Sequence, residues 1–158
     1  MKQFPKWVAA AAAVALLIGF GTVSSFAQDK EAVIKERRDA MKQQSDDFKL
    51  VKAYLDGTGD QATAIAKVKD MLSINDKLSG LWLAGTSSKD LPGKTNAKSE
   101  VWEQMDKFKA TLAALKAEEQ KLLDAVQKGD KAAGTTAFGD AGKNGCGACH
   151  GTFREKLT

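Results

Sequence analysis

The feature that most constrains this chain is a long apolar stripe with helical spacing in its second half. Apolar side chains recur there at steps of three, four or seven residues, which places them on one face of a helix. They are Val101, Met105, Phe108, Leu112, Leu115, Leu122 and Val126. Glu119 is the one residue that interrupts the stripe. A helix with such a face must bury it, so the chain is expected to fold by packing helices together.

Three further segments have helical patterns with clear end signals. The predicted helices span residues 31–55, 61–79 and 130–157. Residues 85–98 lack any period and are expected to form the long connection. Asp60 and Ser99 are suited to cap the helices that follow them, and Gly129 is suited to end one. No stretch of the sequence alternates as a β-strand does, so we predict an all-α fold, an antiparallel four-helix bundle.

Residues 1–27 have the layout of a cleaved secretory signal peptide. Two lysines precede an apolar run, which leads to an exit of small residues at 25–27. An uncleaved membrane anchor is the alternative, because residues 7–26 are just long enough to span a bilayer. Both arrangements place the functional domain outside the cytoplasm, and we expect a periplasmic protein. Cleavage would leave residues 28–158 as a single domain.

The charge pattern argues against several kinds of partner and chemistry. The signal contains two of the 24 lysines and arginines and none of the 20 acids, so its removal lowers the net charge from +4 to +2. The basic residues form no stripe, which argues against nucleic-acid binding. The acidic pairs Asp46-Asp47 and Glu118-Glu119 are interpreted as solvated helix faces. Because no nucleophile, base or carboxylate pair stands out, we expect no enzyme activity.

Both cysteines and the only histidine lie together in Cys146-Gly-Ala-Cys149-His150. On a helix, residues three and four apart share a face, so two thiols and an imidazole can address one object. This spacing is typical of covalent haem attachment, in which each thiol adds to a vinyl group and the imidazole ligates the iron. The motif predicts one haem c, bound through Cys146 and Cys149, with His150 as the proximal iron ligand.

Three other uses of the motif are alternatives. A disulfide between residues three apart closes a small loop and stabilises little. A thiol oxidoreductase has Cys-x-x-Cys at a helix start after a strand, and no strand is predicted here. A structural zinc site needs four ligands, whereas the sequence has only three cysteine and histidine residues. A covalently bound haem fits the motif better than any of these.

The last predicted helix is unusually rich in glycine. Its six glycines are at positions 134, 139, 142, 145, 147 and 151. Each is expected to weaken the helix by about 1 kcal/mol relative to alanine. We predict that these small residues let the flat macrocycle approach the backbone, and that the bonds to haem restore the lost order.

A sixth iron ligand would come from an earlier helix, because only eight residues follow His150. With no second histidine, the candidates are methionines. Met71 and Met105 lie among apolar residues and are expected to pack in the core. Met41 follows Arg37 by one helical turn, so a thioether and a cation share one face. This pair forms either a distal iron site beside a haem propionate or a packed thioether with an arginine that reaches water.

Three blocks of the sequence resemble the class II c-type cytochromes, the cytochrome c′ group and its low-spin relatives. They are Ile34-x-x-Arg37-x-x-x-Met41, Thr95-Asn-Ala-Lys-Ser-Glu-Val-Trp102 and Cys146-Gly-Ala-Cys149-His150-Gly-Thr-Phe153-Arg154. The resemblance implies a four-helix bundle with its haem near the C-terminus, and a homodimer. It implies that Arg37 contacts a haem propionate and that Met41 faces the distal side. It also implies that Phe153 and Arg154 lie on the proximal side.

The two branches of this family imply different functions. In the low-spin branch a methionine closes the sixth iron position and the protein transfers electrons. In cytochrome c′ the iron is five-coordinate and binds small gases such as nitric oxide or carbon monoxide. The run Arg37-x-x-x-Met41-Lys42 is more similar to the low-spin branch. We therefore expect a periplasmic electron carrier with unidentified redox partner proteins, and gas binding is the alternative.

Overall fold

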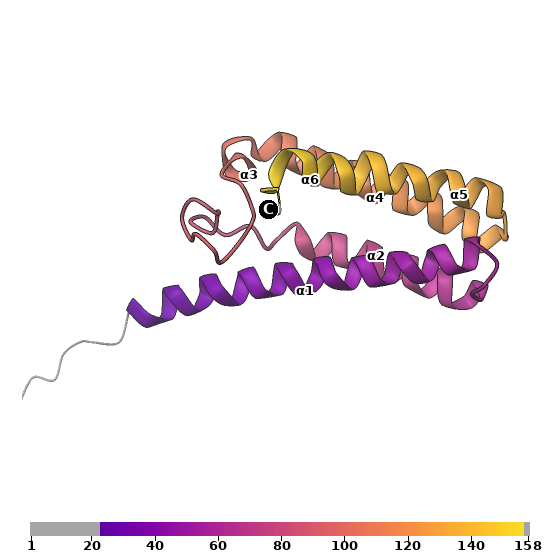
Figure 1. Ribbon diagram of the computed structural model, residues 1–158, viewed down its shortest axis with the longest axis horizontal. Coiled ribbons are helices and arrows are strands. Elements are labelled where there is room, and N and C mark those ends of the chain that lie inside the picture. Colours follow the sequence, from indigo (N-terminus) through magenta and orange to yellow (C-terminus); the bar gives the residue numbers. More distant parts are fainter. Residues whose placement is uncertain (1–22, 157–158) are drawn as a thin grey trace, which may run out of the picture.

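A computed structural model describes residues 23–156, and their helices form an antiparallel bundle with four arms (Figure 1). Three arms are single long helices, and the fourth joins two α-helices through a π-helical stretch, η1. The arms are α1 (Val23–Leu55), α2 (Gln61–Leu78), α4 (Met105–Lys128) and the C-terminal arm of α5 (Lys131–Asp140), η1 (Ala141–Gly147) and α6 (Ala148–Phe153). A short helix, α3 (Glu100–Glu103), precedes α4. The predicted four-helix bundle is confirmed.

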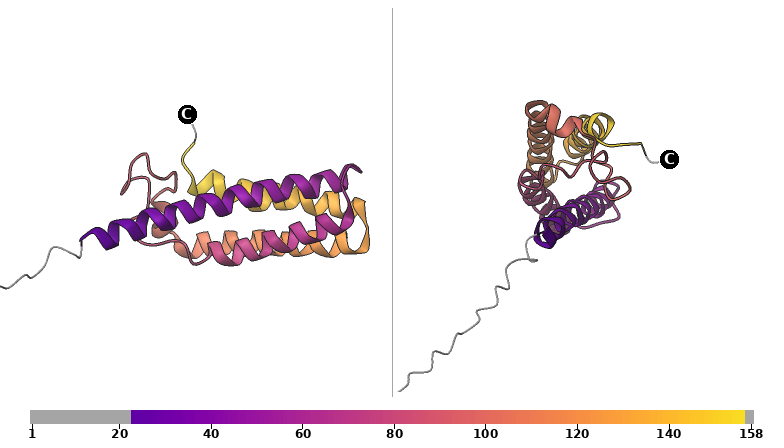
Figure 2. Two further views of the ribbon diagram at one scale, coloured as in Figure 1. Left: turned by 90° about the horizontal axis from the view of Figure 1, so that it is seen from below. Right: turned by 90° about the vertical axis from the view of Figure 1, so that its left-hand side faces the viewer.

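The four arms lie around a common centre, as the end-on view of Figure 2 shows. Helix α1 packs on α2, α2 on α4, and α4 on the whole C-terminal arm. Within the described chain, the backbone of α1 closely approaches the C-terminal arm only at α5. Phe48 and Phe138 stack there, with ring centroids 3.8 Å apart. Farther along, α1 and the arm line the cavities described below.

The bundle has two apolar clusters, one at each end. The larger cluster joins all four arms near the turns, and Met71 is fully buried in it. The smaller one lies beside the long loop and contains Val101, Phe108, Leu112, Cys149 and Phe153, with Met105 packed against it. The predicted core positions of Met71 and Met105 are therefore confirmed.

Two predicted helix ends have the local geometry that the sequence indicates. Asp60 accepts a hydrogen bond from the Thr63 backbone N–H (2.8 Å) and caps α2. Gly129 adopts a left-handed conformation (φ 72°) and ends α4. Asp130 then caps α5 by accepting from the Ala133 backbone N–H (3.0 Å).

The predicted third helix is broken near its start, and Ser99 does not cap it. Ser99 has helical φ and ψ instead of the extended conformation of a capping residue, and its Oγ lies 3.4 Å from Glu100 Oε2. Gln104 (φ −125°, ψ 45°) then separates α3 from α4. The preceding loop is hydrogen-bonded to the last residue of α6, because the Lys98 N–H donates to the Phe153 carbonyl (3.0 Å).

The C-terminal arm differs from the single helix predicted over residues 130–157. Its α-helical hydrogen bonding gives way to seven residues of π-helix, and α6 ends at Phe153. The glycines of this arm were expected to make room for the haem, but two of them lie against another helix instead. A Cβ at Gly134 would lie 2.8 Å from Leu55 Cδ2, and one at Gly145 would lie 3.2 Å from Leu115 Cα. Close helix packing is the reason for glycine at these two positions.

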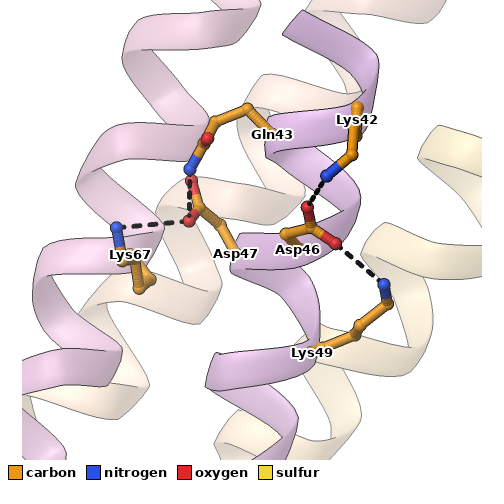
Figure 3. Close-up of polar contacts among 6 residues, drawn as sticks. All are labelled: Lys42, Gln43, Asp46, Asp47, Lys49 and Lys67. Atoms are coloured by element: carbon orange, nitrogen blue, oxygen red, sulfur yellow. Dashed lines mark hydrogen bonds and ion pairs between the residues drawn. The ribbon is translucent and has the colours of Figure 1, made fainter. Parts of the chain in front are cut away.

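The pair Asp46-Asp47 was predicted to be solvated, and this is wrong for Asp47. Asp46 is partly exposed and pairs with Lys42 and Lys49, whereas Asp47 is only 1% exposed and lies between α1 and α2 (Figure 3). Gln43 Nε2 donates to Asp47 Oδ1 (2.9 Å), and Lys67 Nζ of α2 lies 3.3 Å from the same oxygen. Polar partners on two helices thus allow a carboxylate on the buried face.

The predicted signal peptide falls mostly outside the described residues. Residues 1–22 are not described, and residues 23–27 form the start of α1. Among the helices described, none has an apolar stretch long enough to cross a membrane.

Candidate functional site

Two adjoining cavities lie between α1 and the C-terminal arm, with volumes of about 430 and 310 Å³. Four residues line both of them: Met41, Ser45, Cys149 and His150. The first cavity continues toward the long loop, and the second toward the bundle core. The structure therefore brings the predicted distal methionine and the predicted proximal histidine to the same partly open space.

The Cys-x-x-Cys-His motif lies along one wall of this space. Cys146 belongs to η1, and Cys149 and His150 belong to α6. Burial raises the pKa of both thiols, that of Cys149 to about 11. Burial, with a smaller effect of Arg154, lowers the pKa of His150. Two neutral thiols and a neutral imidazole therefore face the cavities at neutral pH.

The surroundings of the motif disfavour its other uses. A thiol oxidoreductase needs a lowered thiol pKa, the opposite of what burial produces here. Within residues 23–156, no cluster of three or more histidine, cysteine or acidic side chains is arranged to hold a metal ion. Both cysteines are free, with no bond between them.

Arg37 is an inward-facing cation with an incomplete set of partners. It is 5% exposed, and its Nη2 donates to the Thr86 carbonyl (3.0 Å). Its guanidinium lies over the Trp82 ring, 4.8 Å from the centroid, and 5.9 Å from that of Trp102. Burial lowers its pKa to about 10, so the group stays charged at neutral pH. This geometry excludes the alternative in which Arg37 reaches water.

Two residues that line the first cavity have a buried hydrogen-bond donor without an acceptor among the described residues. Arg37 Nη1 and Trp82 Nε1 have no hydrogen-bond partner within the described chain, and both residues line this cavity. Buried donors are costly when unpaired, and an arginine fork suits a carboxylate. The pair fits an anionic group bound in the first cavity.

The residues after the motif close the same end of the site. Phe153 is 3% exposed and meets the Phe108 ring edge to face, with centroids 5.2 Å apart. Arg154 is exposed and lines the first cavity. Its backbone pairs with Ala97 of the long loop, which fixes its place at the rim.

Several site residues were missed from the sequence. Trp82 and Thr86 come from the loop region, where no periodic pattern indicates which way a side chain points. Gln44 lines the second cavity and is 6% exposed. Glu119 was interpreted as solvated, and this is wrong, because its side chain is fully buried and accepts from Gln44 Nε2 (2.5 Å). Its place within an otherwise apolar stripe was the available signal.

These residues fit a covalently attached haem. The two thiols and the imidazole come from the C-terminal arm, the thioether of Met41 comes from α1, and the residues with unpaired donors, Arg37 and Trp82, line the first cavity. The second cavity is lined mainly by apolar side chains, as the faces of a porphyrin require, and the first also has basic residues that suit its acidic groups.

Comparisons with known proteins agree with this chemistry. A protein-family profile described as Cytochrome C′ matches residues 32–154. Cytochrome c′ of Pararhodospirillum photometricum is 31% identical over 126 residues, which cover 79% of this chain and 98% of that protein.

Solved structures show the same likeness. A nitric oxide complex of the L16I mutant of cytochrome c prime from Alcaligenes xylosoxidans is 26% identical, with a TM-score of 0.70 over 80% of this chain and 97% of that one. A cytochrome c′ described as having an unusual ligand-controlled dimer dissociation is also 26% identical, with a TM-score of 0.73 over the same shares.

Proposed function

The chain belongs to the cytochrome c′ family, and from this premise we propose that it is an exported single-haem protein that binds nitric oxide or a similar small gas. Its cofactor is one covalent haem c, for which Cys146 and Cys149 are the attachment points. When bound, the haem supplies the iron that takes the gas. The chain itself holds the haem, orients it and excludes water from it.

Each part of the site has a role in this proposal. The neutral imidazole of His150 is the proximal ligand, because its lowered pKa leaves one of the two ring nitrogens without a proton and able to bind iron. The unpaired donors of Arg37 and Trp82 hold a propionate. Arg154 adds a cation at the rim, and Phe153 contributes an apolar wall of the first cavity.

The observation that carries the gas-binding proposal is the apolar lining of the second cavity beside Met41. Leu78, Leu112 and Leu115 contribute to it. Small gases of low polarity are suited to such surroundings, and water is not. The nitric oxide complex of the Alcaligenes relative supports the same role. We therefore prefer this function to the methionine-ligated electron carrier that the sequence favours.

Electron transfer by a histidine- and methionine-ligated iron is the second candidate. The position of Met41 favours it, because this thioether on α1 lines both cavities together with His150 on α6. A methionine opposite a histidine is the usual ligand pair of electron-carrying haems.

Optical spectroscopy of the purified holoprotein separates the two candidates. Gas binding predicts a high-spin ferric spectrum, and a ferrous spectrum that shifts when carbon monoxide or nitric oxide is added. A methionine-to-iron charge-transfer band, with no response to carbon monoxide, would contradict the proposal and support electron transfer.

Two matched variants test the role of Met41. Met41→Leu nearly conserves volume and removes the sulfur, and Met105→Leu does the same away from both cavities. For a gas-binding protein, both variants should keep the high-spin spectrum and the carbon monoxide response. If Met41→Leu alone converts a low-spin protein into a gas-binding one, the thioether is an iron ligand.

The proposal includes the location and assembly of the protein. Residues 1–27 act as a signal that is removed on export to the periplasm, which leaves residues 28–158 as one haem domain. The ligand-controlled dimer of the relative supports a homodimer. Intact mass and sedimentation of the exported protein, with and without carbon monoxide, test the cleavage site and the dimer.

A further inference from the structure

We infer that Glu119 is a proton-binding site coupled to the haem, which takes up one proton when the iron gains one electron. This goes beyond gas binding and does not depend on it, since only the covalent haem is required. The electron comes from an external one-electron donor and the proton from water.

Glu119 lies at the centre of a buried polar cluster that joins three arms of the bundle. Its side chain is fully buried on α4. Gln44 of α1 donates from Nε2 to Glu119 Oε1 (2.5 Å), and Asn75 of α2 donates from Nδ2 to Oε2 (3.4 Å). Asn75 Nδ2 also lies 3.3 Å from the Leu112 carbonyl. The carboxyl group is therefore held in one place by neutral amides.

The carboxylate form of Glu119 is poorly compensated. Among the described residues, no cationic side chain makes an ion pair or hydrogen bond with it. Burial raises the pKa of Glu119 to about 7, although the bonds from Asn75 and Gln44 oppose the rise. The group can therefore gain or lose a proton near neutral pH.

The charged groups around Glu119 do not replace a partner. Asp76 of α2 raises the pKa of Glu119, and Lys116 of α4 lowers it. These two side chains are exposed and pair with each other, so their effects largely cancel. On the C-terminal arm, Glu119 acts electrostatically on the Cys146 thiol, which becomes a neutral thioether when haem is attached.

Two contacts connect this cluster to the haem site. Gln44, the closest donor to Glu119, lines the second cavity together with Met41 and His150. The charge of Glu119 also raises the pKa of Cys146, so the carboxylate acts electrostatically at an attachment point of the haem. Iron that gains an electron loses one unit of positive charge and stabilises the carboxylate less. The pKa of Glu119 must then be higher in the reduced protein.

The midpoint potential of the holoprotein should therefore depend on pH near neutrality. Between the two pKa values of Glu119, the potential should fall as pH rises, with a limiting slope of about 59 mV per pH unit. Spectroelectrochemical titration over a pH range that brackets 7 measures this. Glu119→Gln keeps the size and hydrogen-bonding capacity of the side chain and should abolish the slope. Asp124→Asn removes an exposed acid of the same helix and should keep it.

A second variant and a second measurement test the same coupling. Gln44→Leu removes the shorter hydrogen bond to the carboxylate, so the sloping region should move to higher pH. In the infrared spectrum of the wild-type holoprotein, one protonated carboxylic acid should disappear as pH rises through the neutral range, at higher pH in the reduced state. This measurement does not need the Glu119 variant to fold.

An unchanged slope in Glu119→Gln overturns the inference. So does an infrared spectrum without a neutral carboxylic acid just below neutral pH. Neither result bears on the proposed gas binding, which is read from the carbon monoxide response.

Discussion

Gly145 is expected to be the glycine of the C-terminal arm that least tolerates alanine. In a helix, alanine is favoured over glycine by about 1 kcal/mol. At this position the added methyl would lie 2.5 Å from Leu115 Cδ1, 3.1 Å from its Cβ and 3.2 Å from its Cα. The end of the leucine can move, but its backbone cannot move without displacing α4. Overpacking of this kind costs about 1–3 kcal/mol.

Gly145→Ala should therefore give no stabilisation and should lower the free energy of unfolding by up to about 2 kcal/mol, because the overpacking cost offsets or exceeds the gain in helix propensity. Gly139→Ala is the matched control, because a Cβ there meets nothing within 4 Å and the residue lies in α5 of the same arm. This control should gain up to about 1 kcal/mol. Urea unfolding of the two holoproteins, followed by circular dichroism, gives both values.

Equal stabilisation by the two alanines would refute this reasoning. It would mean that η1 and α4 can move apart at Gly145 with little loss in the free energy of unfolding. The yield of covalent haem is a second readout, since Gly145 adjoins Cys146 and a displaced η1 should lower attachment in Gly145→Ala only.

Three further predictions concern buried charges. The pKa of Glu119 is raised from 4.5 to about 7, so the folded state holds this proton more tightly than the unfolded state. Stability should fall by about 3 kcal/mol as pH rises from about 4.5 to 7, and Glu119→Gln should lack this change in urea titrations across that range. Lys67→Gln should cost about 1–2 kcal/mol because it removes the cation from buried Asp47, whereas Lys49→Gln breaks an exposed pair and should cost less than about 0.5 kcal/mol by the same assay. Arg37→Gln should lower the free energy of unfolding of the holoprotein by about 3 kcal/mol, because a buried propionate would lose its cation. Calorimetric unfolding of the two holoproteins measures the difference.

Two helix ends that depend on local chemistry could be predicted from the sequence, although the cap expected at Ser99 does not form. Capping by Asp60 and termination at Gly129 involve contacts within a few residues, and both were predicted correctly. The burial of Met71 follows from an apolar stripe. The break at Gln104 could not be predicted, because the apolar spacing continues through it.

The limits of the sequence are clearest for buried polar residues. Asp47 and Glu119 each follow another acid, a pattern typical of solvated faces, yet Lys67 of α2 pairs with Asp47 and Gln44 of α1 with Glu119 in the interior. The sequence left two alternatives for Arg37, an inward position at the haem site and a side chain that reaches water. Its partners Trp82 and Thr86 come from the connection between α2 and α3. Such contacts depend on tertiary structure and have no local signature.

The central claim is that Cys146 and Cys149 hold a haem covalently between α1 and the C-terminal arm. Intact mass spectrometry of the denatured, exported protein tests it most directly. Covalent attachment predicts the mass of the processed chain plus one haem, and loss of that addition when both cysteines are replaced by serine. A processed chain that carries only its polypeptide mass would contradict it.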